Sequence, residues 1–206
     1  GKLVEEKYGN CADINLFTIG LLNAAGIEAN PVLISTRENG KIKSDYPYTH
    51  FFNYVIILAS VNGNNVLTDA TEILSLNNRI PSRCINDKGL IVQKDKVEWI
   101  GLECLFPSQI TTDIQIEIPN NSIVNSSISK SATEYDASYF RYNYTDKIEN
   151  IKKRLESTDF TVIDSTIVAK NQLNKKEPYI LTYNQTNKPE IVNEKIYLSP
   201  FLKETI

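Results

Sequence analysis

Residues 8–16 read Tyr-Gly-Asn-Cys-Ala-Asp-Ile-Asn-Leu, and this stretch decides how the first half of the chain is expected to fold. Asn10 is a good helix N-cap, and Asp13 follows three residues later, close to a capping-box pattern. Apolar residues then recur at helical spacing, and Gly26 can take the left-handed position that ends a helix. The sequence therefore predicts a helix over about residues 11–25 that begins at its cysteine.

Short segments rich in β-branched and aromatic residues follow this helix and predict antiparallel strands. The expected strands are Ala29–Thr36, His50–Ser60, Val66–Asp69, Leu90–Val92 and Glu98–Ile100. Asn62-Gly63-Asn64 is a hairpin turn signal between the second and third of them. A turn centred there places position 50 opposite about residue 75, and Asp69 opposite residues 54–57.

The composition of the chain changes near Phe106-Pro107-Ser108, after which Asn, Ser, Thr and Lys become more frequent. We therefore predict a domain over residues 1–106 and a smaller β-rich domain with one helix over residues 107–206. The elements expected in the second domain are strands at Ser122–Ser131, Phe160–Ala169, Tyr179–Tyr183 and Lys195–Leu198, and a helix at Asp136–Ser157. The fold class that follows is α+β.

Composition and charge exclude several classes of function. The chain has 206 residues, a net charge of −3 and 23% charged residues, so a basic surface for nucleic acid is not expected. No apolar run is long enough for a membrane span, and the first residues do not form a signal peptide. Three cysteines and one histidine without metal-ligand spacing predict neither a metal nor another cofactor. Because the chain starts at Gly and contains no Met, we interpret it as a fragment of a longer protein.

Three residues stand in the order of a thiol acyl-transfer site: Cys11, His50 and Asp69. A thiolate is stabilised at a helix N-terminus and beside an imidazolium, and Cys11 has the first of these by its position. His50 could supply the second and protonate the leaving amine, while Asp69 could hold the histidine tautomer. These residues are the candidate catalytic group.

Each of the three residues also has a structural interpretation. A lone cysteine in the first turn of a helix is usually a small buried hydrophobe, and a lone histidine at the start of a strand is usually a surface or half-buried polar residue. An aspartate in Thr-Asp-Ala-Thr can cap a turn. Asp13 and Asn15 stand beside Cys11 and could line a cleft or donate to an oxyanion, although capping and packing explain them as well. A bridge between Cys84 and Cys104 is open from the sequence.

Several segments resemble the transglutaminase-like superfamily. They are Gly-Asn-Cys-Ala-Asp-Ile-Asn-Leu at 9–16, the run from Ala25 to Arg37, Phe-Asn-Tyr-Val-Ile at 52–56 and Leu-Thr-Asp-Ala-Thr at 67–71. The resemblance is to transglutaminase-like proteins of Bacteroidetes, in which this domain lies between an N-terminal and a C-terminal β-domain. It covers most of the chain and is specific through about residue 105.

The resemblance implies a papain-like α+β core in which a cysteine-bearing helix packs on an antiparallel sheet. It also implies a Cys-His-Asp triad that transfers an acyl group from an amide to an amine or to water. Cys11 matches the nucleophile and Asp69 the acid. The histidine departs from the pattern. Active relatives are expected to carry Phe-Asn-His-Val-Ile, and here Asn53 matches the asparagine while Tyr54 stands at the position of the histidine. A second register matches His50 to the family histidine and needs a looped insertion before Asp69.

Two functions follow from these registers. If Tyr54 holds the histidine position, the domain is a catalytically degenerate module that binds a protein or peptide or acts as a scaffold. If His50 reaches the thiol, the domain is a cysteine acyl-transferase, protease or amidase that acts on a peptide amide through Cys11, His50 and Asp69. A purely structural or adhesion module is the third class. The resemblance places the parent protein in the periplasm, in the cell envelope or outside the cell, and the oligomeric state stays open.

Overall fold

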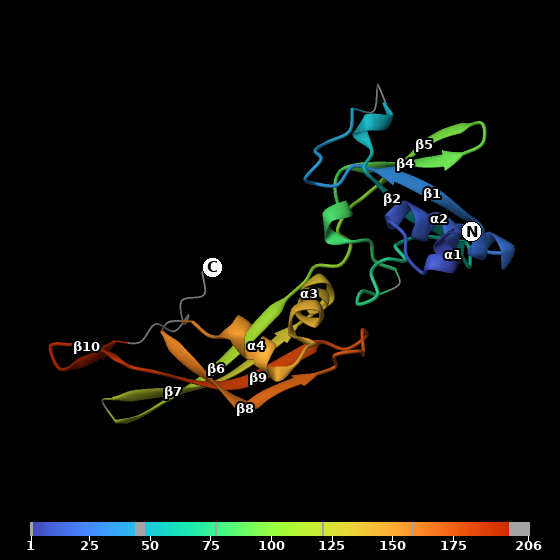
Figure 1. Cartoon of the computed structure of the whole chain (residues 1–206). Helices are drawn as coiled ribbons and strands as arrows, with labels where there is room; N and C mark the ends of the chain where they lie inside the picture. The colour runs from blue at the N-terminus through green and yellow to red at the C-terminus, as the bar shows by residue number, and fades with distance from the viewer. Residues whose placement is uncertain (1, 44–47, 77, 121, 158, 198–206) are drawn as a thin grey trace. The chain divides into compact units, whose positions relative to one another are not determined.

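The computed structural model describes residues 2–43, 48–76, 78–120, 122–157 and 159–197. It divides into two compact units, Gly1–Pro107 and Ser108–Ile206. Each unit combines helices with an antiparallel sheet, so the expected α+β class is confirmed (Figure 1).

The cysteine-bearing helix forms as predicted. After a short first helix, α1 (Lys2–Glu6), helix α2 runs over Cys11–Ala24. The Asn10 side chain accepts a hydrogen bond from the backbone N–H of Asp13 at 2.9 Å, and the Asp13 side chain accepts one from the backbone N–H of Asn10 at 3.0 Å. This reciprocal capping box satisfies donors that the first turn leaves free, which is why the helix begins at Cys11. Gly26 follows its end with φ of +81°.

The first unit is built on a five-stranded antiparallel sheet with strand order β3-β2-β1-β4-β5. Its strands are β1 (Ala29–Ile34), β2 (Tyr54–Val61), β3 (Asn64–Thr68), β4 (Lys88–Gln93) and β5 (Lys96–Gly101). Asn62 and Gly63 both have positive φ, so β2 and β3 form a two-residue hairpin. Ile57 pairs with Thr68 across it, and this register places Asp69 opposite Ile56, as predicted.

The two faces of this sheet carry different cores. Ile57 and Ala59 of β2 pack with Ala29 and with Ile19 of α2, so the helix covers this face. The residues that alternate with them in the strands face the other way. The strand residues Val32, Ile34, Ile56, Leu58 and Ile91 form a second buried cluster with Ile80, Cys84 and Leu102 from the connections, and Tyr54 packs at its margin.

The segment before β2 does not follow the predicted strand. Residues Thr49–Phe51 form a short 3₁₀ helix, η1, in which the N–H groups of Phe51 and Phe52 donate to the carbonyls of Tyr48 and Thr49. Regular pairing with β1 therefore begins only at Tyr54, and His50 lies outside the sheet. Residues 44–47, in the expected loop, lie outside the described residues.

The second unit has a four-stranded antiparallel sheet with order β6-β7-β9-β8 and a separate hairpin of β10 and β11. The strands are β6 (Ile110–Asn120), β7 (Ile123–Ala132), β8 (Phe160–Lys170), β9 (Tyr179–Asn187), β10 (Glu190–Val192) and β11 (Lys195–Tyr197). Strand β6 was not predicted from the sequence.

Two helices, not the single predicted one, cover this sheet. They are α3 (Glu134–Tyr144) and α4 (Ile148–Leu155). The prediction of one helix over Asp136–Ser157 was wrong because the last carbonyl of α3 is hydrogen-bonded to a side chain of strand β9. The hydroxyl of Tyr179 in β9 donates to the carbonyl of Tyr144 at 2.7 Å, and Asp146 accepts from the N–H of Lys147 at 2.7 Å. The first bond engages the carbonyl of the last residue of α3, and the second lies in the turn just before α4.

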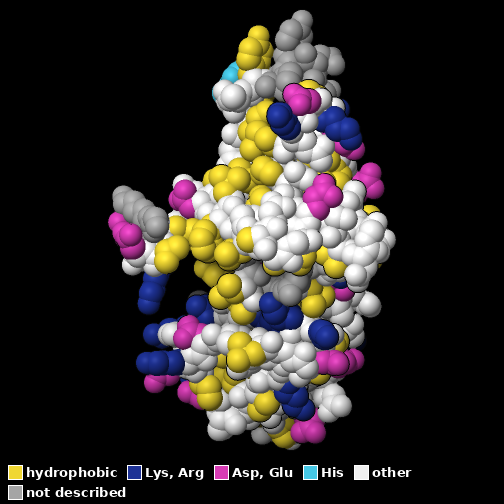
Figure 2. All heavy atoms as spheres, turned by 90° about the vertical axis from the view of Figure 1, so that its right-hand side faces the viewer, with side chains coloured by type: hydrophobic (Ala, Val, Ile, Leu, Met, Phe, Trp, Pro, Cys, Tyr) yellow, Lys and Arg dark blue, Asp and Glu magenta, His cyan; other side chains and the backbone are white. Residues whose placement is uncertain are grey.

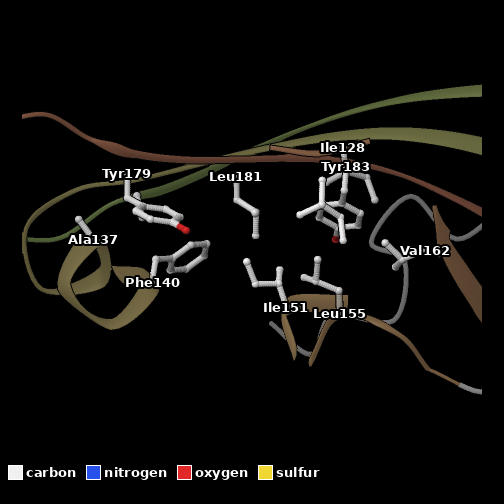
Figure 3. Close-up of a cluster of buried hydrophobic side chains, with 11 residues drawn as sticks. Ile128, Ala137, Phe140, Ile151, Leu155, Val162, Tyr179, Leu181 and Tyr183 are labelled. Atoms are coloured by element: carbon white, nitrogen blue, oxygen red, sulfur yellow. The ribbon is translucent and has the colours of Figure 1, made fainter. Parts of the chain in front are cut away.

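The core of the second unit lies between the helices and the sheet (Figure 3). Phe140 of α3 meets Tyr179 of β9, and Ile151 and Leu155 of α4 point toward the strands. One buried residue beside this core, Arg141, is charged. Its guanidinium donates to the carbonyl oxygens of Asn171, Asn174 and Glu177 at 3.3, 2.8 and 2.6 Å. Burial lowers the pKa of Arg141, and these three oxygens supply the negative partial charge that offsets the lost water.

Candidate functional site

Helix α2 carries Cys11 to one end of the first sheet. The Nδ2 of Asn15 donates to the carbonyl of Val55 at 2.8 Å, and Ile19, one turn later, packs on Ile57 and Ala59. The helix therefore runs in the same direction as β2. Four residues of helix rise about 6 Å, close to the length of two strand residues. Cys11, one turn before Asn15, is thus at the level where β2 begins, and its side chain is half-buried.

Asp69 is buried at the same end of the sheet and is joined directly to α2. Its Oδ2 accepts a hydrogen bond from the Nδ2 of Asn15 at 3.0 Å. Its Oδ1 accepts bonds from the hydroxyl of Thr71 and from the N–H of Thr71, the latter at 2.7 Å. The Oδ1 of Asn15 in turn accepts from the N–H of Ala70 at 2.8 Å. The carboxylate is therefore held by an amide and a threonine.

Tyr54 joins the same network from the other face of the sheet. Its hydroxyl lies 3.1 Å from the Oγ1 of Thr71 and accepts a hydrogen bond from Arg83 at 2.9 Å. Since the Thr71 hydroxyl donates to Asp69, the Tyr54 hydroxyl donates to Thr71. Arg83 also lies over the Tyr54 ring, 5.1 Å from its centroid, and pairs with Glu72 at 2.8 Å.

The hydrogen bonds run in one direction, from Arg83 through Tyr54 and Thr71 to Asp69. The hydroxyls of Tyr54 and Thr71 each accept one hydrogen bond and donate another. Burial raises the pKa of Tyr54 to about 12, so its phenol stays protonated and neutral over the physiological pH range. The position next to Thr71 and Asp69 therefore holds a hydrogen-bond donor and no base.

His50 stands apart from this network. It lies in η1, is exposed, and has Tyr48 and Phe51 as ring neighbours, with ring centroids 5.6 and 4.2 Å away. No hydrogen bond or ion pair joins it to Cys11 or Asp69 in the described ranges. It lies four positions before Tyr54, the first residue of β2.

The other predicted cleft residues have structural contacts. Asp13 is exposed and caps α2. The Oδ1 of Asn53 accepts from the N–H of Thr36, and its Nδ2 donates to the Thr36 hydroxyl, both at 2.9 Å. These two bonds tie the start of β2 to the chain that leaves β1. The residue whose importance the sequence understated is Asn15, because its three partners lie 40 to 55 residues away along the chain.

All three cysteines are free thiols, so Cys84 and Cys104 are not bridged. Cys84 is fully buried in the second cluster of the first unit, and this burial raises its pKa to about 12. Cys104 is exposed. Cys11 is therefore the one half-buried thiol among the three, and it lies at the same end of the sheet as Asp69.

A search of the described residues finds no group of three or more His, Cys, Asp or Glu that could hold a metal ion. None of the helices in the described ranges is long and apolar enough to cross a membrane. On the face drawn in Figure 2, Lys and Arg side chains are interspersed with Asp and Glu and form no continuous basic stripe.

Comparison with known proteins gives no significant match to a family model, a curated protein or a solved structure.

Proposed function

We propose that the first unit is a transglutaminase-like domain of papain type that lacks its catalytic base and serves as a binding or scaffold module in a bacterial envelope protein. Three observations support this interpretation. Cys11 begins a helix, the helix packs on an antiparallel sheet, and Asp69 is buried at the same end of that sheet. Its ligand would be a protein or peptide, because the family pattern acts on peptide amides.

The protonated phenol of Tyr54 carries the proposal. A thiol nucleophile needs a partner that takes its proton and returns it to the leaving amine. Tyr54 stands where the family pattern expects that partner, and its hydroxyl is already engaged by Arg83 and Thr71. A neutral phenol with a pKa of about 12 takes no proton from a thiol at neutral pH.

The alternative is an active acyl-transferase, protease or amidase that uses Cys11, His50 and Asp69. The position of Cys11 at a helix N-terminus favours it, because the helix dipole stabilises a thiolate there. This mechanism requires His50 to leave its ring neighbours and to reach a carboxylate that already accepts hydrogen bonds from Asn15 and Thr71.

Alkylation of Cys11 separates the two functions. Iodoacetamide labelling is followed by mass spectrometry from pH 6 to pH 10 in a Cys104→Ser background, which removes the exposed thiol. We expect His50→Ala to leave the pH profile of Cys11 labelling unchanged, because no imidazole acts on the thiol. Tyr48→Ala, which changes the same exposed segment without touching the imidazole, is the matched control.

A profile that moves to higher pH in His50→Ala but not in Tyr48→Ala would establish the cysteine–histidine pair. Release of ammonia from a glutamine peptide, lost in both Cys11→Ala and His50→Ala, would establish the active enzyme directly.

A further inference from the structure

Strand β6 forms one edge of the second sheet. Its inner side pairs with β7 over most of its length, from Ile110 opposite Ala132 to Asn120 opposite Ile123. No strand of the described ranges pairs with its outer side. The backbone N–H and C=O groups of alternate residues therefore face outward, over a strand about 36 Å long.

The two faces of β6 have opposite character. Asp113, Gln115 and Glu117 are exposed and share one face, because strand residues alternate. Ile114, Ile116 and Ile118 share the other. Ile114 packs at the margin of the core shown in Figure 3, while Ile118 is 40% exposed.

The helices leave the isoleucine side of β6 partly uncovered. The main contacts of α3 are with β7 and β9, and those of α4 are with β8. The opposite edge strand, β8, has a register shift between Ile163 and Val168, which is a device that protects sheet edges from pairing. Strand β6 has a register shift only near its end, between Glu117 and Asn120, where Pro119 also lies, and from Ile110 to Glu117 its pairing with β7 is regular.

We propose that β6 is a docking edge for an extended segment of a partner protein in which basic residues alternate with β-branched ones. The segment adds to the sheet as a fifth strand through backbone hydrogen bonds. Its basic residues lie beside Asp113 and Glu117, and its apolar residues extend the row of Ile114, Ile116 and Ile118. This surface belongs to the second unit and does not rest on the function proposed for the Cys11 site.

A synthetic peptide tests the proposal with the whole chain. The probe is a fluorescein-labelled nine-residue peptide of alternating lysine and valine, and its binding is measured by fluorescence anisotropy in 150 mM salt. The double variant Asp113→Lys/Glu117→Lys replaces two favourable cross-strand pairs by two repulsive ones, and we expect it to bind about tenfold to thirtyfold more weakly. The matched control, Glu149→Lys/Glu190→Lys, makes the same change in net charge at exposed positions on α4 and β10 and should bind as the unmodified chain does.

Backbone methylation distinguishes strand addition from nonspecific attraction. One peptide carries N-methyl groups on its valine amides and another on its lysine amides. In an added strand either the valine amides or the lysine amides face β6, and the others face away from it. One peptide should therefore lose binding and the other should keep it. Equal binding of both peptides, equal weakening by the two double variants, or no binding of the probe would overturn the proposal. A concentration-dependent dimer that Asp113→Lys/Glu117→Lys dissociates would also overturn it, since the occupant would then be a second copy.

Discussion

Asn15 is the residue on which the arrangement around Asp69 depends, and Asn15→Ala tests this directly. The side chain is fully buried and makes three hydrogen bonds, to the carbonyl of Val55, to the carboxylate of Asp69 and from the N–H of Ala70. Two of these bonds join neutral groups, each worth about 0.5–1.5 kcal/mol, and the bond to a charged carboxylate is worth about 1.5–3 kcal/mol. We therefore expect Asn15→Ala to lower the free energy of unfolding of the first unit by about 2.5–6 kcal/mol.

The assay is urea unfolding followed by the fluorescence of Trp99, which is the only tryptophan of the chain and lies in β5. Its signal reports the first unit alone, so the second unit does not distort the transition. Asn64→Ala is the control, because Asn64 is exposed and its side chain makes one long hydrogen bond of 3.4 Å. We expect it to change stability by less than about 0.5 kcal/mol. A loss below about 1 kcal/mol in Asn15→Ala would refute the argument that this amide holds Asp69 to the helix.

Three further outcomes are expected. The first unit should lose stability between about pH 9 and pH 12, because the folded-state pKa values of Cys84 and Tyr54 lie above their unfolded values of about 9 and 10, and the unfolded groups ionise first; Tyr54→Phe should reduce the loss above about pH 10, with Cys84 supplying the remainder, as read from Trp99. Ser126→Ala should leave the second unit as stable or raise its melting temperature by a few degrees in circular dichroism, because the buried Ser126 hydroxyl has no partner among the described residues; a loss above about 1 kcal/mol would contradict this. Arg141→Lys should destabilise the second unit by about 2–4 kcal/mol in the same measurement, because an ammonium cannot span three carbonyl oxygens; an unchanged melting temperature would exclude the role given to Arg141.

Local signals predicted the elements that depend on neighbouring residues. The start of α2 followed from Asn10 and Asp13, whose side chains bond to backbone groups three residues away. The β2–β3 hairpin followed from Asn62 and Gly63, and its centre set the register that places Asp69 opposite Ile56.

Contacts between distant residues decided what the sequence did not predict. The break between α3 and α4 involves Tyr179, which lies 35 residues beyond the carbonyl that it binds. His50 was assigned to a strand because aromatic and β-branched residues follow it, but hydrogen bonds within Tyr48–Phe52 turn the chain into η1. The direction of the bonds from Arg83 to Asp69 depends on four side chains from three separate segments, because Asp69 and Thr71 are near neighbours in the chain.

The way in which Arg141 is held has a consequence for how this protein can vary. Its three partners are all main-chain oxygens of the connection between β8 and β9, so the guanidinium recognises the path of that connection and none of its side chains. Every amino acid carries the same carbonyl. Within the connection, the side chains of Asn171 and Asn174 also bond to the backbone of Pro178 and Lys176. Its other residues can therefore be exchanged in evolution or in engineering without loss of its shape, provided that the arginine stays, whereas a change of its length would remove several of the acceptors together.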